Sequence, residues 1–377
     1  MSTKQLNGGM ILLARKRRKI TQVELAAESG VAQAAISRLE NGSRDALSLE
    51  QIQAIGRVLR FPVSFFFEQD YYHLPCSLHG AAFRKKASVP VKDQDAVVAL
   101  ANHYLIHLRK LLDAIDLEPQ YPLLQFEIVS ELNAASDHAA AVNSPAEAAR
   151  KVRASWQLDD GPLLGLARYV EATGVFVLFA NFEDADIDGV TLRPAGMKPV
   201  IVLNRNRPAD RVRFSLAHEY AHVILHPYPY EAMEMEANEF AAELLMPESG
   251  ILKDLKLRLT IPYLGKLKLK WNTAMSSLIY RAKHLGTITA DEAVSIYKKM
   301  GFYGYRTTEP SDFDVPHERA SLSDKLIQLH VQELGYSLEE LCGVLKTEPE
   351  EFADMYGMAK PTIKIDRPKL RIVASKE

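Results

Sequence analysis

The chain has 377 residues, too many for one ordinary domain, and 47% of them are hydrophobic, which suffices for more than one buried core. The net charge of −2 gives no global attraction to nucleic acid or to a membrane, and the two cysteines exclude a disulfide framework and a thiolate zinc site. We therefore expect a reduced, cytoplasmic protein with neither a signal peptide nor a segment that spans a bilayer.

Positive charge is concentrated at the N-terminus. Residues 1–68 contain ten Lys or Arg and six Asp or Glu, which leaves a local charge of +4 on a chain that is otherwise mildly acidic. This asymmetry is compatible with a small nucleic-acid-binding domain. Within that domain, the run RKRRK at 15–19 is expected to be a solvated helix end that contacts phosphates.

Residues 21–44 follow the helix-turn-helix plan. Thr21 can cap a helix that begins at Gln22, Gly30 supplies a turn, and a second helix is predicted over 33–40. Apolar residues are spaced to pack the two helices together, and the second helix of such a pair enters the major groove of DNA. The aromatic run at 61–67 is expected to close the core of this domain. A small helical domain used for protein contacts is the alternative interpretation.

Residues 8–68 resemble the Xre/Cro family of phage-repressor-like DNA-binding domains, and the matching positions include Gln22, Gly30, Ser37, Arg38 and Asn41. By this resemblance, the residues that face bases are Gln33, Ala34, Ser37 and Arg38, and those that touch phosphates are Gln22, Asn41 and Arg44. Ala32, at the start of the second helix, offers no side-chain oxygen to cap it. The implied partner is a double-stranded DNA operator, bound by a homodimer that reads two half-sites.

Helices and short strands follow in the rest of the chain. Apolar residues at helical spacing predict a long amphipathic helix over 93–116, ended by the prolines at 119 and 122. Ser144 as an N-cap, followed by Pro145, predicts the start of another helix. The remaining predicted elements are helices at 163–174, 210–226 and 231–246, strands at 175–181 and 199–204, a linker at 307–316 and a last small helical unit at 321–356.

The stretch HEYAH at 218–222 has the spacing of a metal site. Residues four apart lie on one face of a helix, so His218 and His222 can both point at one ion. Zinc prefers four ligands, with one position open in a catalytic site, so a third protein ligand must come from a second helix. Glu234 and Glu236 are the candidates, and on a helical wheel Glu234 faces inward with Asn238, whereas Glu236 lies at the edge. Asn238 is then placed to orient a ligating histidine.

HEYAHVILH followed by EMEANEFAAELLMP resembles the ImmA/IrrE family of zincin-like metallopeptidases, and the resemblance covers residues 175–310. Carried over residue by residue, it implies that the metal ligands are His218, His222 and Glu234 and that Glu219 is the general base. The implied cofactor is Zn2+, which would activate a water molecule while Glu219 accepts the proton and delivers it to the leaving amine.

Further side chains near the motif have expected roles of their own. His226 lies on the same face as His222, but it fits better as a cation at the helix C-terminus than as a metal ligand. Tyr228 and Tyr230 are both able to polarise a substrate carbonyl, and nothing in the sequence chooses between them.

These features predict a mainly α chain with a small β-sheet (α+β). The expected parts are a helix-turn-helix domain at 1–70, a helical connecting region at 71–170, a zincin-like domain at 171–310 and a small helical unit with a tail at 317–377. The expected function is a transcriptional regulator whose zinc endopeptidase domain cleaves a regulatory protein such as a repressor. The alternative is a DNA-binding repressor or antitoxin whose metal domain senses a ligand and cuts nothing. Glu219 favours the peptidase, since a sensor needs no base.

Overall fold

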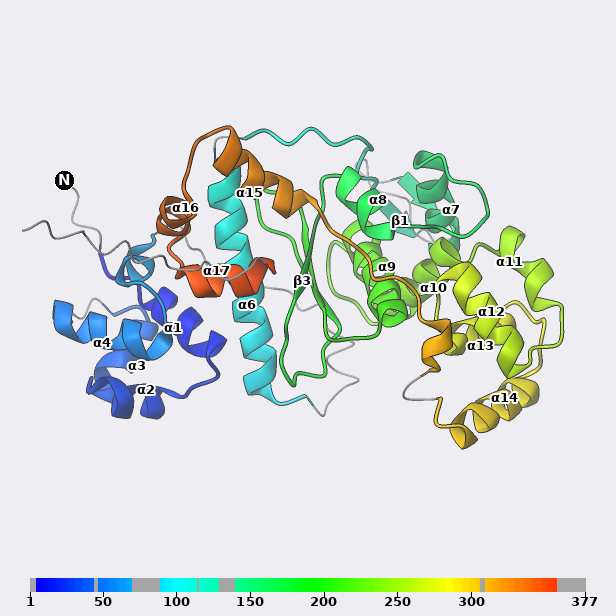
Figure 1. Cartoon of the computed structure of the whole chain (residues 1–377), viewed down its shortest axis with the longest axis horizontal. Helices are drawn as coiled ribbons and strands as arrows, with labels where there is room; N and C mark the ends of the chain where they lie inside the picture. The colour runs from blue at the N-terminus through cyan, green and yellow to red at the C-terminus, as the bar shows by residue number, and fades with distance from the viewer. Residues whose placement is uncertain are drawn as a thin grey trace, which may run out of the picture.

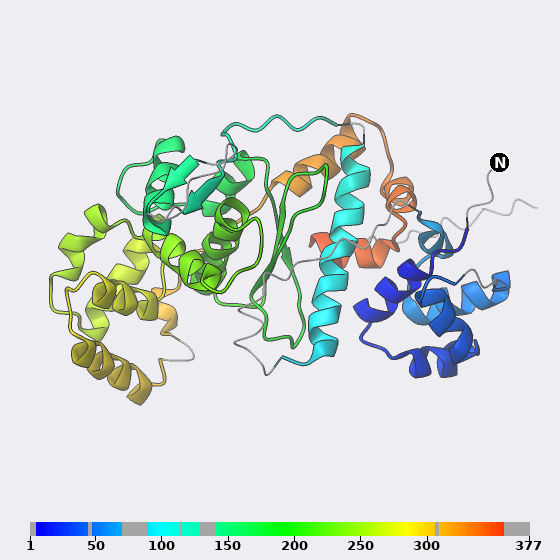
Figure 2. The same ribbon diagram turned by 180° about the vertical axis from the view of Figure 1, so that it is seen from behind.

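The computed structural model describes residues 5–43, 47–69, 89–113, 115–128, 140–305 and 309–357. The molecule is elongated, with the N-terminal helices at one end, a sheet flanked by helices in the middle and a further group of helices at the other end (Figure 1). The reverse view shows the long helix α6 (Val91–Leu112) standing between the N-terminal helices and the sheet (Figure 2). The fold is α+β, as the sequence predicts.

The N-terminal bundle consists of α1 (Gly8–Arg17), α2 (Gln22–Ser29), α3 (Gln33–Glu40), α4 (Leu49–Leu59) and the 3-10 turn η1 (Val63–Phe67). A capping box starts α2, because the Thr21 hydroxyl accepts a bond of 3.1 Å from the Glu24 backbone N–H and the Glu24 carboxylate accepts one of 2.6 Å from that of Thr21. Gly30 ends α2 with a φ of +69°, which glycine adopts without strain. As the sequence predicts, α3 starts without a side-chain cap at Ala32.

The core of the bundle closes on its aromatic run. Phe65 and Phe66 are completely buried in the same cluster as Leu25 of α2 and Ile36 of α3. Burying a phenylalanine side chain contributes roughly 1.5–3 kcal/mol, so the run is a main stabiliser of the bundle, and the prediction for 61–67 is confirmed. Ala99 of α6 belongs to this cluster too, so the bundle rests directly on α6.

α6 separates two cores and is buried on most of its surface. Ala99 faces the bundle, whereas Leu100 and Tyr104 face the sheet, and the Tyr104 hydroxyl donates a bond of 2.6 Å to the Met355 carbonyl oxygen. The predicted helix is confirmed in position but its predicted end is wrong, since α6 stops at Leu112, before the prolines at 119 and 122.

The sheet beside α6 has the strand order β3–β5–β4. The strands are β3 (Phe176–Ala180), β4 (Gly189–Leu192) and β5 (Val200–Asn204). β3 is parallel to β5, and β4 is antiparallel to it. The sequence predicts β3 and β5 but misses β4, because a run of four residues at 189–192 is too short to show a clear period.

All residues of the central strand β5 are buried because the sheet is covered on both faces. Ile201 and Leu203 belong to the cluster that contains α9, and Val200 and Val202 belong to the cluster that contains α6. Successive side chains of a strand point to opposite faces, so the two sets enter different cores. The sheet thereby couples the helices on its two sides.

The helices on the far side of the sheet are α7 (Pro145–Ser155), α8 (Leu166–Ala172), α9 (Ala209–Leu225) and α10 (Met233–Leu245), next to a parallel pair of short strands, β1 (Phe126–Ile128) and β2 (Ala140–Val142). Ser144 caps α7 by accepting a bond of 3.1 Å from the Glu147 backbone N–H, and Pro145 is the first helical residue, as predicted. α10 packs against both α7 and α9. This packing fixes how the side chains of α9 and α10 face each other.

The helices at the other end are α11 (Glu248–Leu255), α12 (Ile261–Trp271), α13 (Met275–His284) and α14 (Ala290–Phe302). The buried Lys268 of α12 pairs with Asp210 of α9 at 2.6 Å and with Glu309, after α14, at 2.8 Å. A buried ammonium group needs such partners to offset its lost hydration. Asp210 therefore ties α12 to α9, and Glu309 ties α12 to the segment that follows α14.

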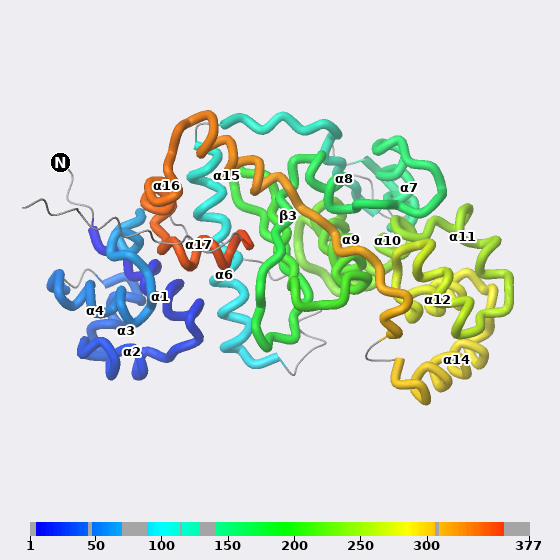
Figure 3. The backbone as a smooth tube through the Cα atoms, viewed as in Figure 1, coloured from blue at the N-terminus to red at the C-terminus, as the bar shows by residue number. Residues whose placement is uncertain are grey.

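After α14 the chain runs back along the body to the N-terminal bundle (Figure 3). This part contains the 3-10 turn η2 (Ser311–Phe313), α15 (Leu322–Gln332), α16 (Leu338–Leu345) and α17 (Pro349–Tyr356), so the helices predicted over 321–356 are confirmed. Leu326, Leu341 and Phe352 share one core with α6 and the sheet. The C-terminal helices are therefore packed on the body and reach the N-terminal bundle.

Candidate metal centre and nucleic-acid interface

α9 and α10 bring three ligand-type side chains together. His218 and His222 lie four residues apart on α9, and Glu234 in the first turn of α10 reaches both. The Nε2 atoms of the two histidines are 3.1 Å apart, and the Glu234 carboxylate oxygens lie 3.3 Å from Nε2 of His218 and 3.4 Å from Nε2 of His222. One ligand atom from each residue lies within 4.8 Å of the others, close enough to share a metal ion.

This donor set fits a metal ion. Oε1 of Glu234 is buried and accepts no hydrogen bond from the described residues, which is costly for a carboxylate oxygen. Burial opposes ionisation of Glu234, but His218 and His222 outweigh it and hold its pKa well below the ordinary value. Burial also lowers the pKa of His222 to about 3, so its ring is neutral and can offer a lone pair. Two imidazoles and a carboxylate are a ligand set that zinc accepts in catalytic sites.

Asn238 lies beside the first histidine. Its Oδ1 is 3.0 Å from Nδ1 of His218. When Nδ1–H donates to this amide oxygen, Nε2 keeps its lone pair and points at His222 and Glu234. The contact gives Asn238 the position that the sequence predicts for a residue that orients a ligand.

Glu236 contacts His226 and lies outside the cluster of three ligand-type side chains. Its Oε2 is 3.1 Å from Nε2 of His226, whose Nδ1 is 2.8 Å from Nδ1 of His222. Burial lowers the pKa of His226 although Glu236 acts to raise it, so the expectation of a cation at His226 is wrong. The Tyr230 hydroxyl donates to Glu236, whereas Tyr228 is 78% exposed.

The cation at the C-terminus of α9 is Arg193, which directly follows β4. Its guanidinium group donates to the carbonyl oxygens of His222 and Val223. Carbonyl groups in the last turn of a helix have no helical partner and attract cations. Sequence analysis misses this residue because it precedes His222 by 29 positions.

Glu219 lies on α9 next to the ligand-type histidines and faces β4. The Thr191 hydroxyl donates a bond of 2.7 Å to Oε2 of Glu219. A side chain at Gly189 would place its Cβ 3.1 Å from Cγ of Glu219, so glycine leaves the room that this carboxylate needs. Burial raises the pKa of the Glu219 carboxyl, and His218 and Thr191 offset that only in part. Thr191 and Gly189 are missed by sequence analysis, because the run GVTL between the two predicted strands is too short to be recognised as a strand.

The candidate DNA-reading residues lie on one side of the bundle. Gln33, Ala34, Arg38 and Asn41 are exposed and Ser37 is half-buried. Arg44 lies outside the described residues. These residues come from α3 and its C-terminal end, as the helix-turn-helix plan requires.

A hydrogen-bond network joins α2 and α3 behind this surface. The Gln22 side-chain amide donates to the Glu40 carboxylate at 2.8 Å, and that of Gln33 donates to the Gln22 amide oxygen at 3.0 Å. Arg15 binds both oxygens of Glu40, at 2.7 and 2.6 Å. Such a two-bond pair is strong and directional, so it fixes Gln22 and Gln33 relative to each other.

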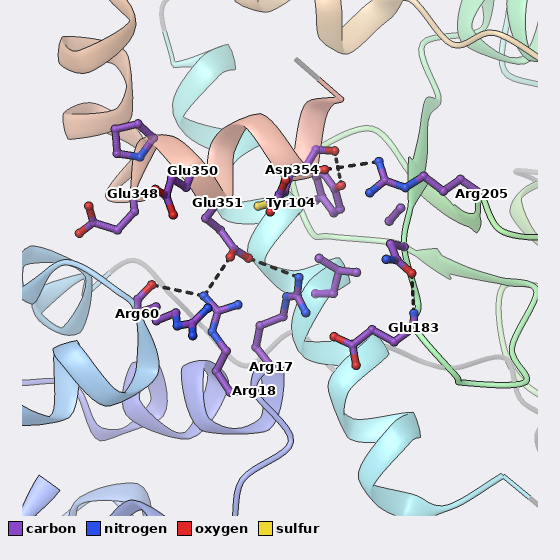
Figure 4. Close-up of a pocket in the computed structure, with 15 residues that line it drawn as sticks. Arg17, Arg18, Arg60, Tyr104, Glu183, Arg205, Glu348, Glu350, Glu351 and Asp354 are labelled. Atoms are coloured by element: carbon purple, nitrogen blue, oxygen red, sulfur yellow. Dashed lines mark hydrogen bonds and ion pairs between the residues drawn. The ribbon is translucent and has the colours of Figure 1, made fainter. Parts of the chain in front are cut away.

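Residues 16–19 of the basic run face the body of the molecule and Arg15 pairs with Glu40 inside the bundle, so the expected role of the run as a solvated, phosphate-binding helix end is wrong. Arg17 and Arg18 both bind Glu351 of α17, at 3.3 and 2.9 Å (Figure 4). The neighbouring ion pairs are Lys16–Asp95, Lys19–Asp93 and Lys19–Glu183. Of these residues, Arg17, Arg18, Glu183 and Glu351 line a cavity of about 790 Å³ between the bundle, α6 and α17. The positive charges of residues 16–19 therefore pair with carboxylates of the body and dock the bundle on it.

The fold and site define a DNA-binding protein that carries a metallopeptidase-type domain. Residues 170–283 match the family Peptidase_M78, described as an IrrE N-terminal-like domain, and residues 11–66 match the family HTH_3, described as helix-turn-helix. The chain is therefore a fusion of an Xre-type helix-turn-helix domain with a domain of the ImmA/IrrE peptidase family. No curated protein gives a significant match. None of the described helices is long and apolar enough to cross a membrane.

Proposed function

We propose that the chain is a zinc metalloendopeptidase that binds DNA and cleaves a regulatory protein such as a repressor. The observation that carries the proposal is the position of the Glu219 carboxylate, beside the cluster of His218, His222 and Glu234 and held by Thr191. Those three residues would hold the ion. When bound, zinc supplies a Lewis acid that activates water at neutral pH and polarises a carbonyl group.

Glu219 is the side chain that moves the proton. Thr191 holds Oε2, which leaves Oε1 to accept a proton from the attacking water. Burial raises the pKa of this carboxyl, which makes it a stronger base and lets it carry the proton to the leaving amine. A ligand-sensing domain has no use for a base in this position, and that favours the peptidase over the sensor.

The helix-turn-helix domain would localise the peptidase on DNA. The exposed Gln33 and Arg38 of α3 are suited to hydrogen bonding with base edges, so the protein would sit on an operator in the cytoplasm as a homodimer. A repressor bound at the same promoter would then be at a high local concentration. Tethering of this kind favours cleavage of one protein over the many others in the cell.

Glu219→Gln tests the proposal. The purified, zinc-loaded variant should keep its metal and its DNA binding, because Glu219 is neither a ligand nor part of the bundle. Cleavage of a repressor encoded beside the gene should fall by roughly 10²- to 10⁴-fold, since no base remains. The control is Glu231→Gln, which removes the same charge at an exposed position before α10 and should cleave normally. If wild type and Glu219→Gln regulate the target promoter identically in cells, proteolysis is not the function and a metal-dependent sensor replaces it.

A further inference from the structure

A chain of hydrogen bonds leads from His222, one of the three ligand-type side chains, to the carboxylate of Glu236. Nδ1 of His222 faces Nδ1 of His226 at 2.8 Å, and Nε2 of His226 faces Oε2 of Glu236 at 3.1 Å. The Tyr230 hydroxyl donates to the same carboxylate oxygen. His226 is completely buried, so these two contacts account for both of its ring nitrogens.

With Glu236 ionised and His226 neutral, the contacts allow one direction for the protons of this chain. An ionised carboxylate is a hydrogen-bond acceptor only, so Nε2 of His226 must donate to Glu236. A neutral imidazole carries one N–H, and therefore Nδ1 of His226 accepts. The donor in that bond is Nδ1–H of His222. Nε2 of His222 is left with its lone pair, and it points at His218 and Glu234.

We infer that His226 and Glu236 are positioning residues, which hold His222 in the tautomer and orientation that offer Nε2 to a metal ion. The inference rests on the proposed function in one respect, that the cluster binds a metal. Asn238 orients His218 in the same way through one contact, with 3.0 Å between Nδ1 of His218 and the amide oxygen of Asn238. In both histidines Nδ1 thus contacts a residue outside the three ligand-type side chains and Nε2 faces the other two of them, which is the arrangement of metal-ligating histidines.

Tyr230 holds the acceptor end of the chain. It lies in the connection between α9 and α10, and its hydroxyl restrains the half-buried Glu236 carboxylate, which contacts His226. Glu236 therefore acts on His222 through His226 and does not contact the ion site itself. It lies two residues from the ligand candidate Glu234, on the other side of the helix. Loss of a residue that orients a ligand typically weakens metal binding on the order of 10- to 100-fold.

The test measures the His222 tautomer and metal affinity in the full-length protein. In the metal-free protein, long-range proton–nitrogen NMR correlations should show the His222 proton on Nδ1. His226→Phe, which keeps an aromatic ring but cannot accept, should shift the proton toward Nε2 and raise the Kd for Zn2+ and Co2+ by roughly 10- to 100-fold in chelator competition. Glu236→Gln, at a half-buried position that tolerates substitution better, should act in the same direction, and the Co2+ absorption spectrum should change in both variants.

Glu239→Gln, which removes a carboxylate from the same helix, is the matched control and should bind both metals like the wild type. A proton on Nε2 of His222 in the wild type would overturn the inference. So would Kd values within about twofold of the wild type in both variants, well below the range expected for such residues. A wild type that binds metal with the expected tautomer but cleaves nothing would leave this inference standing and refute the proposed function alone.

Discussion

Replacing Glu351 with Gln should loosen the N-terminal bundle from the rest of the molecule. The carboxylate of Glu351 is the common partner of Arg17 and Arg18, the two guanidinium groups at the C-terminal end of α1. The substitution keeps the size of the side chain and removes its charge. Both arginines then lose their ionic partner in a place where water reaches them poorly.

The exposed fractions of the three side chains set the size of the effect. Glu351 is 13% exposed, Arg17 15% and Arg18 20%, so the pairs lie between the exposed and the buried limit. Exposed ion pairs are worth less than about 1 kcal/mol each, and hydrogen bonds to buried charged groups about 1.5–3 kcal/mol. A value near 1 kcal/mol for each pair gives about 2 kcal/mol for the loss of both, which is more than a tenfold shift in the docking equilibrium.

Hydrogen exchange of the full-length protein measures this shift. Amides of α1 and of the α6 face that covers it should exchange at least about tenfold faster in Glu351→Gln at low salt, because both are protected by docking. Added salt should weaken docking in the wild type and have a smaller effect in the variant, since screening acts on the same pairs. Glu350→Gln, an exposed neighbour on α17, is the control and should exchange like the wild type.

Unchanged exchange of α1 in Glu351→Gln at low salt would refute the reasoning. The apolar contact of Phe65 with His103 and Ala99 would then hold the bundle without help from the ion pairs. The basic run at 15–19 would in that case be available to another partner.

Three further predictions follow from the described contacts. His103, whose ring nitrogens have no partner among the described residues, has a pKa well below 6.5 because it is buried and lies near arginines, so only the unfolded chain gains its proton as the pH falls. At pH values below 6.5 this group should therefore lower the free energy of unfolding by about 1.4 kcal/mol per pH unit. His103→Leu should flatten this dependence of the free energy of unfolding on pH, measured by urea denaturation, and an unchanged slope contradicts the assignment. Glu234→Gln should lower bound zinc further than Glu236→Gln, because it alters a ligand and not its support, and metal analysis showing equal retention would reject Glu234 as a ligand. Arg38→Ala should lose sequence preference, at about 1–3 kcal/mol per base contact, whereas Gln22→Ala should weaken binding to all DNA similarly; titrations on operator and random DNA decide, and a full-length protein without salt-dependent DNA binding contradicts both.

Local signals in the sequence determine much of this molecule. The capping box at Thr21 and the turn at Gly30 place α2 and α3 at the predicted residues, because a cap acts over three positions and a left-handed turn over one. Helical periodicity also places Glu234 and Glu236 on different sides of α10, since the side of a helix on which a residue lies follows from its spacing to apolar neighbours. These features need no knowledge of distant parts of the chain.

Only the tertiary structure decides which distant groups meet. Arg17 and Glu351 are 334 positions apart, so nothing near the basic run shows that it meets a carboxylate instead of phosphates. The sequence predicts a cation at His226 because it cannot show that this ring is buried beside Glu236. Both the burial and the contact depend on how α10 packs against α9. Thr191 meets Glu219 only because β4 pairs with β5 and passes α9. The sequence gives the type of each side chain, and spacing gives the face of the helix or strand on which it lies. The charge state and the partner of a side chain depend on how far folding excludes water from it, which only the tertiary structure determines.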